Sequence, residues 1–299
     1  MTAITLCLTA GFAGLVAIGF PFAIAIALCV TAALLVADIE PAFLAQSVLS
    51  GAQSFSLLAI PLFMLAGGLM TAGGLSQRLV DFAGTLVRHR TGGLAMVAVL
   101  SALIFSAISG SSVATAATMG SVALPYFEGT RYSQRMVLGS LAAGGALGNL
   151  IPPGITFIIY GLITETSVGA LYVAALLPSI LVTGLFILVI LAHGITHPME
   201  RPPPLPLAVK LRGSVQLIPT LLLMLLVLGS IYAGLATPTE AAALGVVGAA
   251  VFAAVEGRLT LRLLHASAEA TARNTALLGL IIFGAWLLNY LLTSINVPQ

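Results

Sequence analysis

A polar stretch, SGSSVATAATMG at residues 109–120, lies between two strongly apolar runs, residues 94–108 and 122–126. If this stretch forms the tip between two helices, its carbonyl and hydroxyl oxygens could bind a hard monovalent cation. The unpaired N–H groups at the start of the second helix could bind a carboxylate. The alternative is that its small residues only allow close helix packing, and on this stretch alone the alternative stays open.

A second candidate is GNLIPPGITFIIYG, residues 148–161, which places Pro152 and Pro153 in the middle of an apolar run. A proline removes a backbone donor and clashes with the preceding turn, and it disfavours helical geometry in the residue before it. Two in succession predict a break that leaves the carbonyl groups of Gly148, Asn149 and Ile151 free. A simple kink is the alternative. A polar hairpin tip and a discontinuous helix are together components of a secondary-transporter site.

The composition indicates whether these segments lie in water or in a lipid bilayer. Of 299 residues, 60% are hydrophobic and only 7% are charged, which predicts an all-α integral membrane protein. The apolar runs are continuous and long, whereas the strands of a membrane barrel alternate. A net charge of +2 gives no reason to expect nucleic acid. Ser111 and Ser112 have no plausible base nearby, so we expect no enzyme and no cofactor.

The elements that position the two candidates follow from the apolar runs and their interruptions. We expect two helices in residues 3–37, divided at Gly19–Pro21, and a polar connection at 78–90. Two arms are expected in 92–127 and a broken helix in 134–164. Further spans are expected at 57–73, 170–192, 215–236, 239–255 and 276–292, with a polar loop at 193–212.

Lys and Arg residues indicate the orientation. Four clusters fall on one side if all are cytoplasmic: Arg78, Arg88 and Arg90; Arg131 and Arg135; Arg201, Lys210 and Arg212; Arg258 and Arg262. The N-terminus and the acidic pair Asp38 and Glu40 are then outside. Because clusters on the same side flank residues 92–128, that segment must enter the membrane and return. This predicts a re-entrant helical hairpin with its tip at residues 109–112.

Two weaker patterns complete the picture. In TPTEAAA, residues 237–243, we expect Thr237 and Glu240 to form a capping box, in preference to an ion site. A shift of the chain by 217 positions superimposes Pro21 on Pro238 and Gly67 on Gly284. In the orientation above, the turns at these two prolines lie on opposite sides of the membrane, which is what an inverted repeat requires. In that register the second hairpin tip would fall beyond Gln299, so we expect the second repeat to be incomplete.

Four ordered motifs resemble the large, DctM-like membrane subunit of tripartite ATP-independent periplasmic (TRAP) transporters. They are IPLFMLAGGLM…GGLSQRLVDFA, FSAISGSSVATAATMGSVALP, GNLIPPGITFIIYG and TPTEAAA. The resemblance implies an elevator-type, sodium-coupled importer of organic anions, such as C4-dicarboxylates, sialic acid or other sugar acids. It also implies two partners, a periplasmic substrate-binding protein and a small four-helix membrane subunit. The location implied is the bacterial inner membrane, with the N-terminus periplasmic.

The same resemblance implies the site residues. Sodium, the one metal expected, would be bound between the hairpin tip and the broken helix by Ser109, Gly110, Ser111, Ser112, Thr115, Gly148, Asn149 and Pro152. The candidates for the substrate site are Ser112, Thr115, Pro153 and Thr156. Two other interpretations remain: a single-component sodium/dicarboxylate symporter, and a truncated remnant that does not transport.

These interpretations divide the chain into four parts. Residues 1–56 are expected to form the first scaffold and arm helices. Residues 57–166 form half of the transport domain, with the hairpin at 92–128 and the broken helix at 134–165. Residues 167–264 form scaffold helices with a cytoplasmic loop at 193–213, and residues 265–299 begin the second transport-domain repeat.

Overall fold

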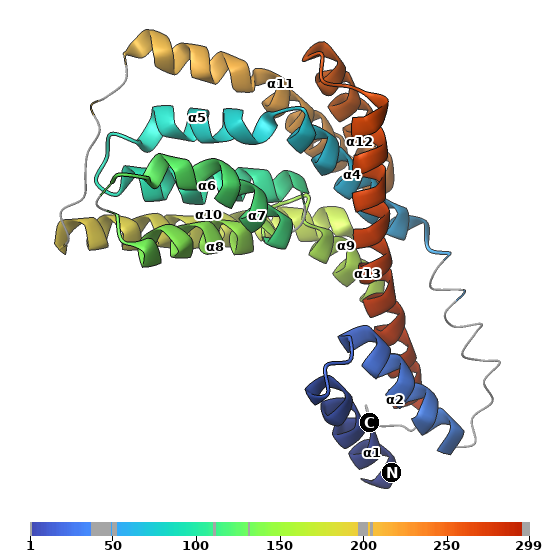
Figure 1. The fold of residues 1–299 in the computed structure, drawn as a ribbon. Helices are drawn as coiled ribbons and strands as arrows, with labels where there is room; N and C mark the ends of the chain where they lie inside the picture. The colour runs from blue at the N-terminus through green and yellow to red at the C-terminus, as the bar shows by residue number, and fades with distance from the viewer. Residues whose placement is uncertain are drawn as a thin grey trace. The chain divides into compact units, whose positions relative to one another are not determined.

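The computed structural model describes residues 2–36, 49, 53–109, 112–130, 132–196, 203 and 206–294. Within these residues the secondary structure is helical, and no strand occurs, in agreement with the predicted all-α class. Asp38, Glu40, Gly110 and Ser111 lie outside the described residues. The chain divides into two compact units, residues 1–55 with 272–299 and residues 56–271, shown in Figure 1.

The first unit contains α1 (Thr2–Ala17), α2 (Phe22–Val36) and the part of α13 (Leu261–Ser294) that follows residue 271. The predicted break between α1 and α2 is present at Gly19, whose φ of +95° favours glycine. Leu291 of α13 packs in a buried cluster with Val30 and Leu34 of α2. Gly284 lies so close to α2 that an added Cβ would be 3.3 Å from Cγ2 of Ile26.

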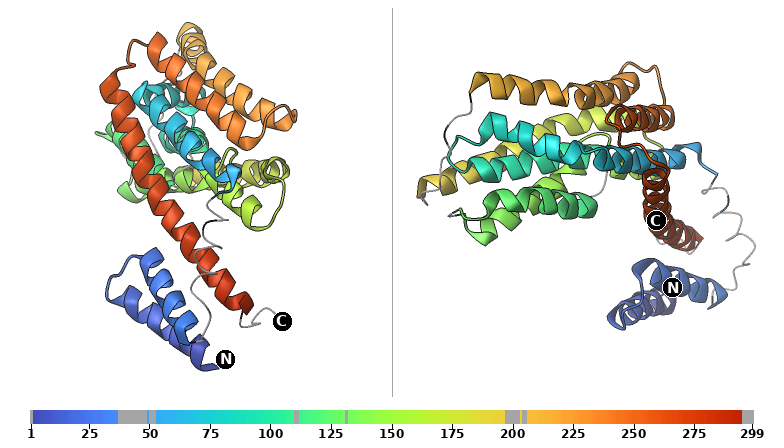
Figure 2. Two further views of the ribbon diagram at one scale, coloured as in Figure 1. Left: turned by 90° about the vertical axis from the view of Figure 1, so that its right-hand side faces the viewer. Right: turned by 45° about the horizontal axis from the view of Figure 1, so that its top comes forward.

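The second unit contains the remaining helices, seen from two further directions in Figure 2. They are η1 (Phe55–Leu58), α4 (Ala59–Ala72), α5 (Leu75–Val87), α6 (Gly93–Ser109), α7 (Ser112–Ala123), η2 (Leu124–Phe127), α8 (Gln134–Gly148), α9 (Ile155–Ile163), α10 (Val168–Thr196), α11 (Leu207–Tyr232) and α12 (Pro238–Val255). Helix α8 packs against both α6 and α7, and α4 packs along α12. The unit's largest buried cluster includes Leu79, Phe105 and Met119.

The predicted polar connection at residues 78–90 is wrong, because most of it is helix α5. Leu75, Leu79 and Ala83 recur every fourth residue and are buried, so they form one apolar face. Gln77 and Asp81 on the other side are exposed. The segment is therefore mainly an amphipathic helix, with Asp81 on its exposed side and with Arg88 and Arg90 after its last residue.

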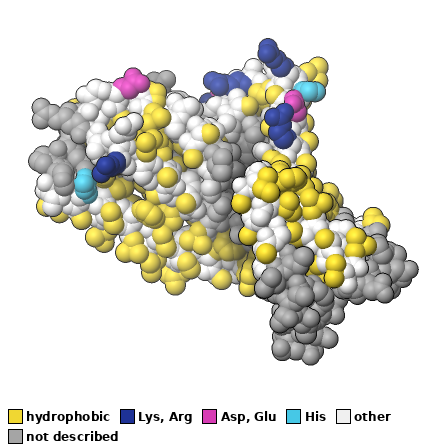
Figure 3. Space-filling view, turned by 60° about the horizontal axis from the view of Figure 1, so that its bottom comes forward, with side chains coloured by type: hydrophobic (Ala, Val, Ile, Leu, Met, Phe, Trp, Pro, Cys, Tyr) yellow, Lys and Arg dark blue, Asp and Glu magenta, His cyan; other side chains and the backbone are white. Residues whose placement is uncertain are grey.

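Two further predicted boundaries also differ. Helix α10 continues to Thr196 and α11 begins at Leu207, so the connection between them is shorter than the predicted loop at 193–213. Helix α13 begins at Leu261, so the expected boundary at 264/265 falls within a continuous helix. Among the described residues, five helical segments are long and apolar enough to cross a membrane. Hydrophobic side chains cover much of the face shown in Figure 3.

Contacts within the second unit place basic segments at both ends of α5. An ion pair joins Arg78 of α5 to Glu256, directly after α12. Gly194 of α10 lies beside Thr91, where an added Cβ would be 2.5 Å from Cγ2 of that threonine. A Cβ added to Gly213 of α11 would lie 3.0 Å from Cγ2 of Thr85 in α5. The contact of Arg78 therefore lies near the beginning of α5, and those of Thr85 and Thr91 lie near and beyond its end.

The two ends of the 92–128 segment also lie together. The backbone N–H of Leu94, at the start of α6, donates a hydrogen bond to the Tyr132 hydroxyl at 3.4 Å. Tyr132 follows η2 and packs edge-on against Phe127 at 5.5 Å between ring centroids. The chain thus leaves along α6 and returns along α7 to the place where it began, which is the geometry of a helical hairpin.

Candidate functional site

A glycine face on α8 allows the broken helix to approach the hairpin closely. A Cβ added to Gly144 would lie 2.6 Å from Cβ of Ala102 and 2.8 Å from the carbonyl oxygen of Val99, both on α6. A Cβ added to Gly148 would overlap the Ser106 side chain. Real Cβ atoms do not make such contacts, so α6 and α8 approach each other at a distance that only glycine permits.

The returning arm of the hairpin reaches the same face. A Cβ added to Gly145 would lie 3.1 Å from the carbonyl oxygen of Ser112, the first residue of α7. Ser106 of α6 donates its hydroxyl proton to the Gly145 carbonyl at 3.1 Å. The start of α7 and the end of α8 are therefore neighbours, and the described part of the hairpin tip lies next to the broken helix.

Asn149 is the C-cap of α8 and lies on the side of the helix that carries Gly145. Its backbone is helical, with φ −69° and ψ −20°, so it lies one turn beyond Gly145 on the same side of the helix. Its side-chain oxygen Oδ1 is buried and has no hydrogen-bond partner. A buried carbonyl-type acceptor beside a hairpin tip is a suitable ligand for a small hard cation.

The chain between α8 and α9 is interrupted where Pro152 and Pro153 predict it. The N–H of Ile151 donates to the Gly148 carbonyl at 3.3 Å, so that carbonyl is not free as predicted and retains one lone pair. Ser179 of α10 contacts the Leu150 carbonyl at 2.8 Å. The carbonyl of Asn149 lies close to the start of α9, at 2.6 Å from a Cβ added to Gly154.

The predicted site residues differ in how deeply they are buried. Ser112 is half-buried, Thr115 is fully buried and Pro152 is buried. Thr156 is exposed on α9. Only the backbone of Ser109 is described, and Gly110 and Ser111 lie outside the described residues.

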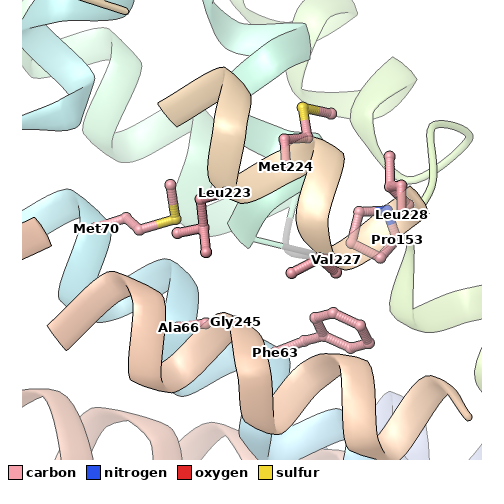
Figure 4. Close-up of a pocket in the computed structure, with 9 residues that line it drawn as sticks. All are labelled: Phe63, Ala66, Met70, Pro153, Leu223, Met224, Val227, Leu228 and Gly245. Carbon is pink, nitrogen blue, oxygen red and sulfur yellow. The ribbon is translucent and has the colours of Figure 1, made fainter. Parts of the chain in front are cut away.

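Pro153, a candidate for the substrate site, lines an apolar pocket (Figure 4). Its other lining residues are Phe63, Ala66, Met70, Leu223, Met224, Val227, Leu228 and Gly245, from α4, α11 and α12. None of these side chains offers a hydrogen bond or a charge to a carboxylate. The surroundings of Pro153 in this pocket therefore suit a hydrocarbon group better than an anion.

Sequence reasoning missed several residues that shape the site. Ser140, Gly144 and Gly148 recur every fourth residue, which is the spacing of a close helix contact and could have been recognised. Nothing local indicates that Ser106 or Ser179 contacts the broken helix, because their partners lie 39 and 29 positions away in the chain.

The expectation for Thr237 and Glu240 is confirmed. The Thr237 hydroxyl accepts a hydrogen bond from the Glu240 N–H, and the Glu240 carboxylate accepts one from the Thr237 N–H at 2.7 Å. This capping box begins α12. Glu240 therefore has a local structural role in this helix.

Comparisons with known proteins agree with these features. The family model of the DctM component of tripartite ATP-independent periplasmic transporters matches residues 9–299. A C4-dicarboxylate TRAP transporter large permease protein of Pseudomonas aeruginosa is 38% identical over 261 residues, which cover 86% of this chain and 60% of that protein. The 2,3-diketo-L-gulonate TRAP transporter large permease protein of Escherichia coli is 34% identical over 288 residues, covering 96% and 68%.

A third relative is the sialic acid TRAP transporter large permease protein of Vibrio cholerae, 32% identical over 261 residues, covering 86% of this chain and 60% of that protein. The chain thus spans about 60% to 68% of the length of these relatives. The match extends over both compact units and includes the hairpin and the broken helix. The chain is therefore a multi-pass membrane protein and belongs to the DctM family of TRAP transporter large permeases.

Proposed function

We propose that this chain serves as the membrane permease subunit of a binding-protein-dependent secondary importer of organic anions, with sodium as the coupling ion. The relatives are named for C4-dicarboxylates, 2,3-diketo-L-gulonate and sialic acid, all of which are carboxylates at neutral pH. An organic carboxylate is the substrate class that these names share, and we extend it to this chain.

The observation that carries the sodium proposal is the unpartnered Oδ1 of Asn149. A buried acceptor without a partner costs about 1–3 kcal/mol, and a bound cation would remove this cost. The ligands proposed are this oxygen together with oxygens of the hairpin tip and of the break: those of Ser109, Gly110, Ser111, Ser112, Thr115, Gly148 and Pro152. These ligands are uncharged, so the site would keep the ion's full positive charge.

That charge supports binding of an anion next to it. The helix dipoles of α7 and α9 place partial positive charge at their first residues, Ser112 and Ile155. A carboxylate near these ends would be attracted both by the helix termini and by a bound sodium ion. Coupling would then arise because the ion and the anion each increase the affinity for the other.

The transport cycle we propose is an elevator movement of the hairpin and the broken helix. The partners would be a small four-helix membrane subunit and a periplasmic binding protein, in a bacterial inner membrane with the N-terminus periplasmic. The names of the relatives, each a TRAP large permease, favour this assembly over a single-component sodium/dicarboxylate symporter. Uptake into vesicles that stops when the binding protein is omitted would distinguish the two; uptake without it would favour the symporter.

Sodium binding can be tested on the purified 299-residue chain in detergent. We expect its thermal unfolding temperature to rise with NaCl and not with KCl at equal ionic strength, because the ion binds only the folded state. Asn149→Ala should lose most of this response. Asn274→Ala, at an exposed position, is the matched control and should keep it. Equal responses in the two variants would exclude Asn149 as a ligand.

A further inference from the structure

One face of α10 is buried, although most of this long helix is exposed. Tyr172, Ala175 and Ser179 are 0%, 5% and 3% exposed, whereas Leu177 and Ile180 are 74% and 69% exposed. The three buried residues are spaced three and four apart, so they lie in one stripe along the helix. This stripe faces the broken helix.

The stripe contacts the chain on both sides of the break. Before the two prolines, the Ser179 hydroxyl lies 2.8 Å from the Leu150 carbonyl. After them, the Tyr172 ring packs edge-on against Phe157 of α9, with 5.9 Å between centroids and an angle of 89°. A single continuous helix thus supports the end of α8 and the beginning of α9.

The backbone at the break needs contacts from another helix. Pro152 and Pro153 have no N–H to donate, so the helical hydrogen bonds that would cross the break are missing. Leu150 directly follows Asn149, and its carbonyl would otherwise have no donor among the hydrogen bonds of the break. The direction of the Leu150 carbonyl, and with it the backbone next to Asn149, therefore depends on Ser179.

We propose that Ser179 is a positioning residue for the cation site at the break. This inference rests on the proposed sodium site at Asn149. Ser179 does not contact the ion; its hydroxyl fixes the backbone that presents the Asn149 oxygen. The hydroxyl has one proton and two carbonyl acceptors, Leu150 at 2.8 Å and Ala175 of its own helix at 2.6 Å. A shift of the proton toward Ala175 releases the Leu150 carbonyl, so the position of α10 affects the ion site.

The test compares Ser179→Ala with Thr183→Val in the purified 299-residue chain. Thr183 donates its hydroxyl proton to the Ser179 carbonyl, so its hydrogen bond stays within α10, and the valine removes a hydroxyl without touching the break. Sodium affinity is measured from the dependence of the unfolding temperature on NaCl. Hydrogen–deuterium exchange of residues 148–157 is measured without sodium.

Loss of one neutral hydrogen bond predicts about fivefold weaker sodium binding in Ser179→Ala. Exchange in residues 148–157 should be faster in the same variant, and Ser179→Thr, which keeps the hydroxyl, should restore both properties. Thr183→Val should match the wild type. Unchanged exchange and unchanged affinity in Ser179→Ala would overturn the proposal. A wild-type chain that does not respond to sodium would instead refute the sodium site, while the exchange comparison would still test the support by Ser179.

Discussion

The contact between α6 and α8 predicts that Gly148→Ala destabilises the protein. The added Cβ would overlap Cβ and Oγ of Ser106 and lie 2.8 Å from its Cα. Oγ can rotate about the Cα–Cβ bond, but Cα and Cβ are fixed by the backbone of α6, so the two helices must separate. Overpacking of this kind costs about 1–3 kcal/mol.

Two smaller effects modify this value. Separation of the helices would also break the hydrogen bond from Ser106 to the Gly145 carbonyl, at a cost of about 1 kcal/mol. Alanine is a better helix former than glycine by up to about 1 kcal/mol. The two nearly cancel, so we expect a net loss of about 1–3 kcal/mol.

The matched control is Gly139→Ala on the same helix, where an added Cβ meets nothing within 4 Å. It should be neutral or stabilising by up to about 1 kcal/mol. Thermal unfolding of both variants in the same detergent measures the difference. Ser106→Gly should partly relieve Gly148→Ala, giving a double-mutant cycle with a clear coupling. If Gly148→Ala is as stable as Gly139→Ala, the close packing of α6 and α8 is refuted.

Three further predictions concern polar contacts outside this interface. Thr237→Ala should destabilise the protein by about 1 kcal/mol in thermal unfolding, because the capping box of α12 is lost; a stability equal to the wild type would contradict that role. Burial and the hydrogen bond to Asp81 raise the pKa of Tyr126, so its neutral form stabilises the fold at lower pH and this contribution is lost as pH rises through the folded pKa. Asp81→Asn should lower the pKa of Tyr126, seen as earlier phenolate absorbance in an alkaline titration corrected with Tyr126→Phe, and no change would exclude the contact. A double-mutant cycle on Arg78 and Glu256 should give a coupling below about 1 kcal/mol that decreases with salt, because both side chains are partly exposed; a larger coupling that does not depend on salt would contradict this view of the pair.

The features that the sequence predicted correctly depend on local chemistry. The successive prolines Pro152 and Pro153 interrupt a helix because two neighbouring residues lack an N–H, whereas the single prolines Pro178 and Pro219 lie within α10 and α11. The return of residues 92–128 to their starting point was predicted from the basic residues on both sides of the segment, whereas its entry into the membrane stays a prediction. The contact between Leu94 and Tyr132 has that geometry. Such constraints need no knowledge of tertiary contacts.

The features that were missed depend on partners distant in the chain. The charged residues of 78–90 led to the prediction of a polar connection, and the buried face of α5, formed by Leu75, Leu79 and Ala83, was not recognised. The role of Ser179 exists only because α10 lies beside the break, and a serine in an apolar helix has the same appearance wherever it points. Pattern recognition could find which segments are interrupted, but not which helix supports the interruption.

The packing of the two units strengthens the repeat that was weak in sequence. In the second unit, Gly73 after α4 lies against Phe252 of α12, at 3.3 Å from an added Cβ. The shift of 217 positions relates this pair to Leu35 and Tyr290. In the first unit, Leu34 of α2 packs in a cluster with Leu291, and Tyr290 packs against it. Each unit therefore pairs a helix from one repeat with a helix from the other, α4 with α12 in the second unit and α2 with α13 in the first. Few identical residues are needed for this pairing, because small and apolar side chains at matching positions suffice to preserve the packing.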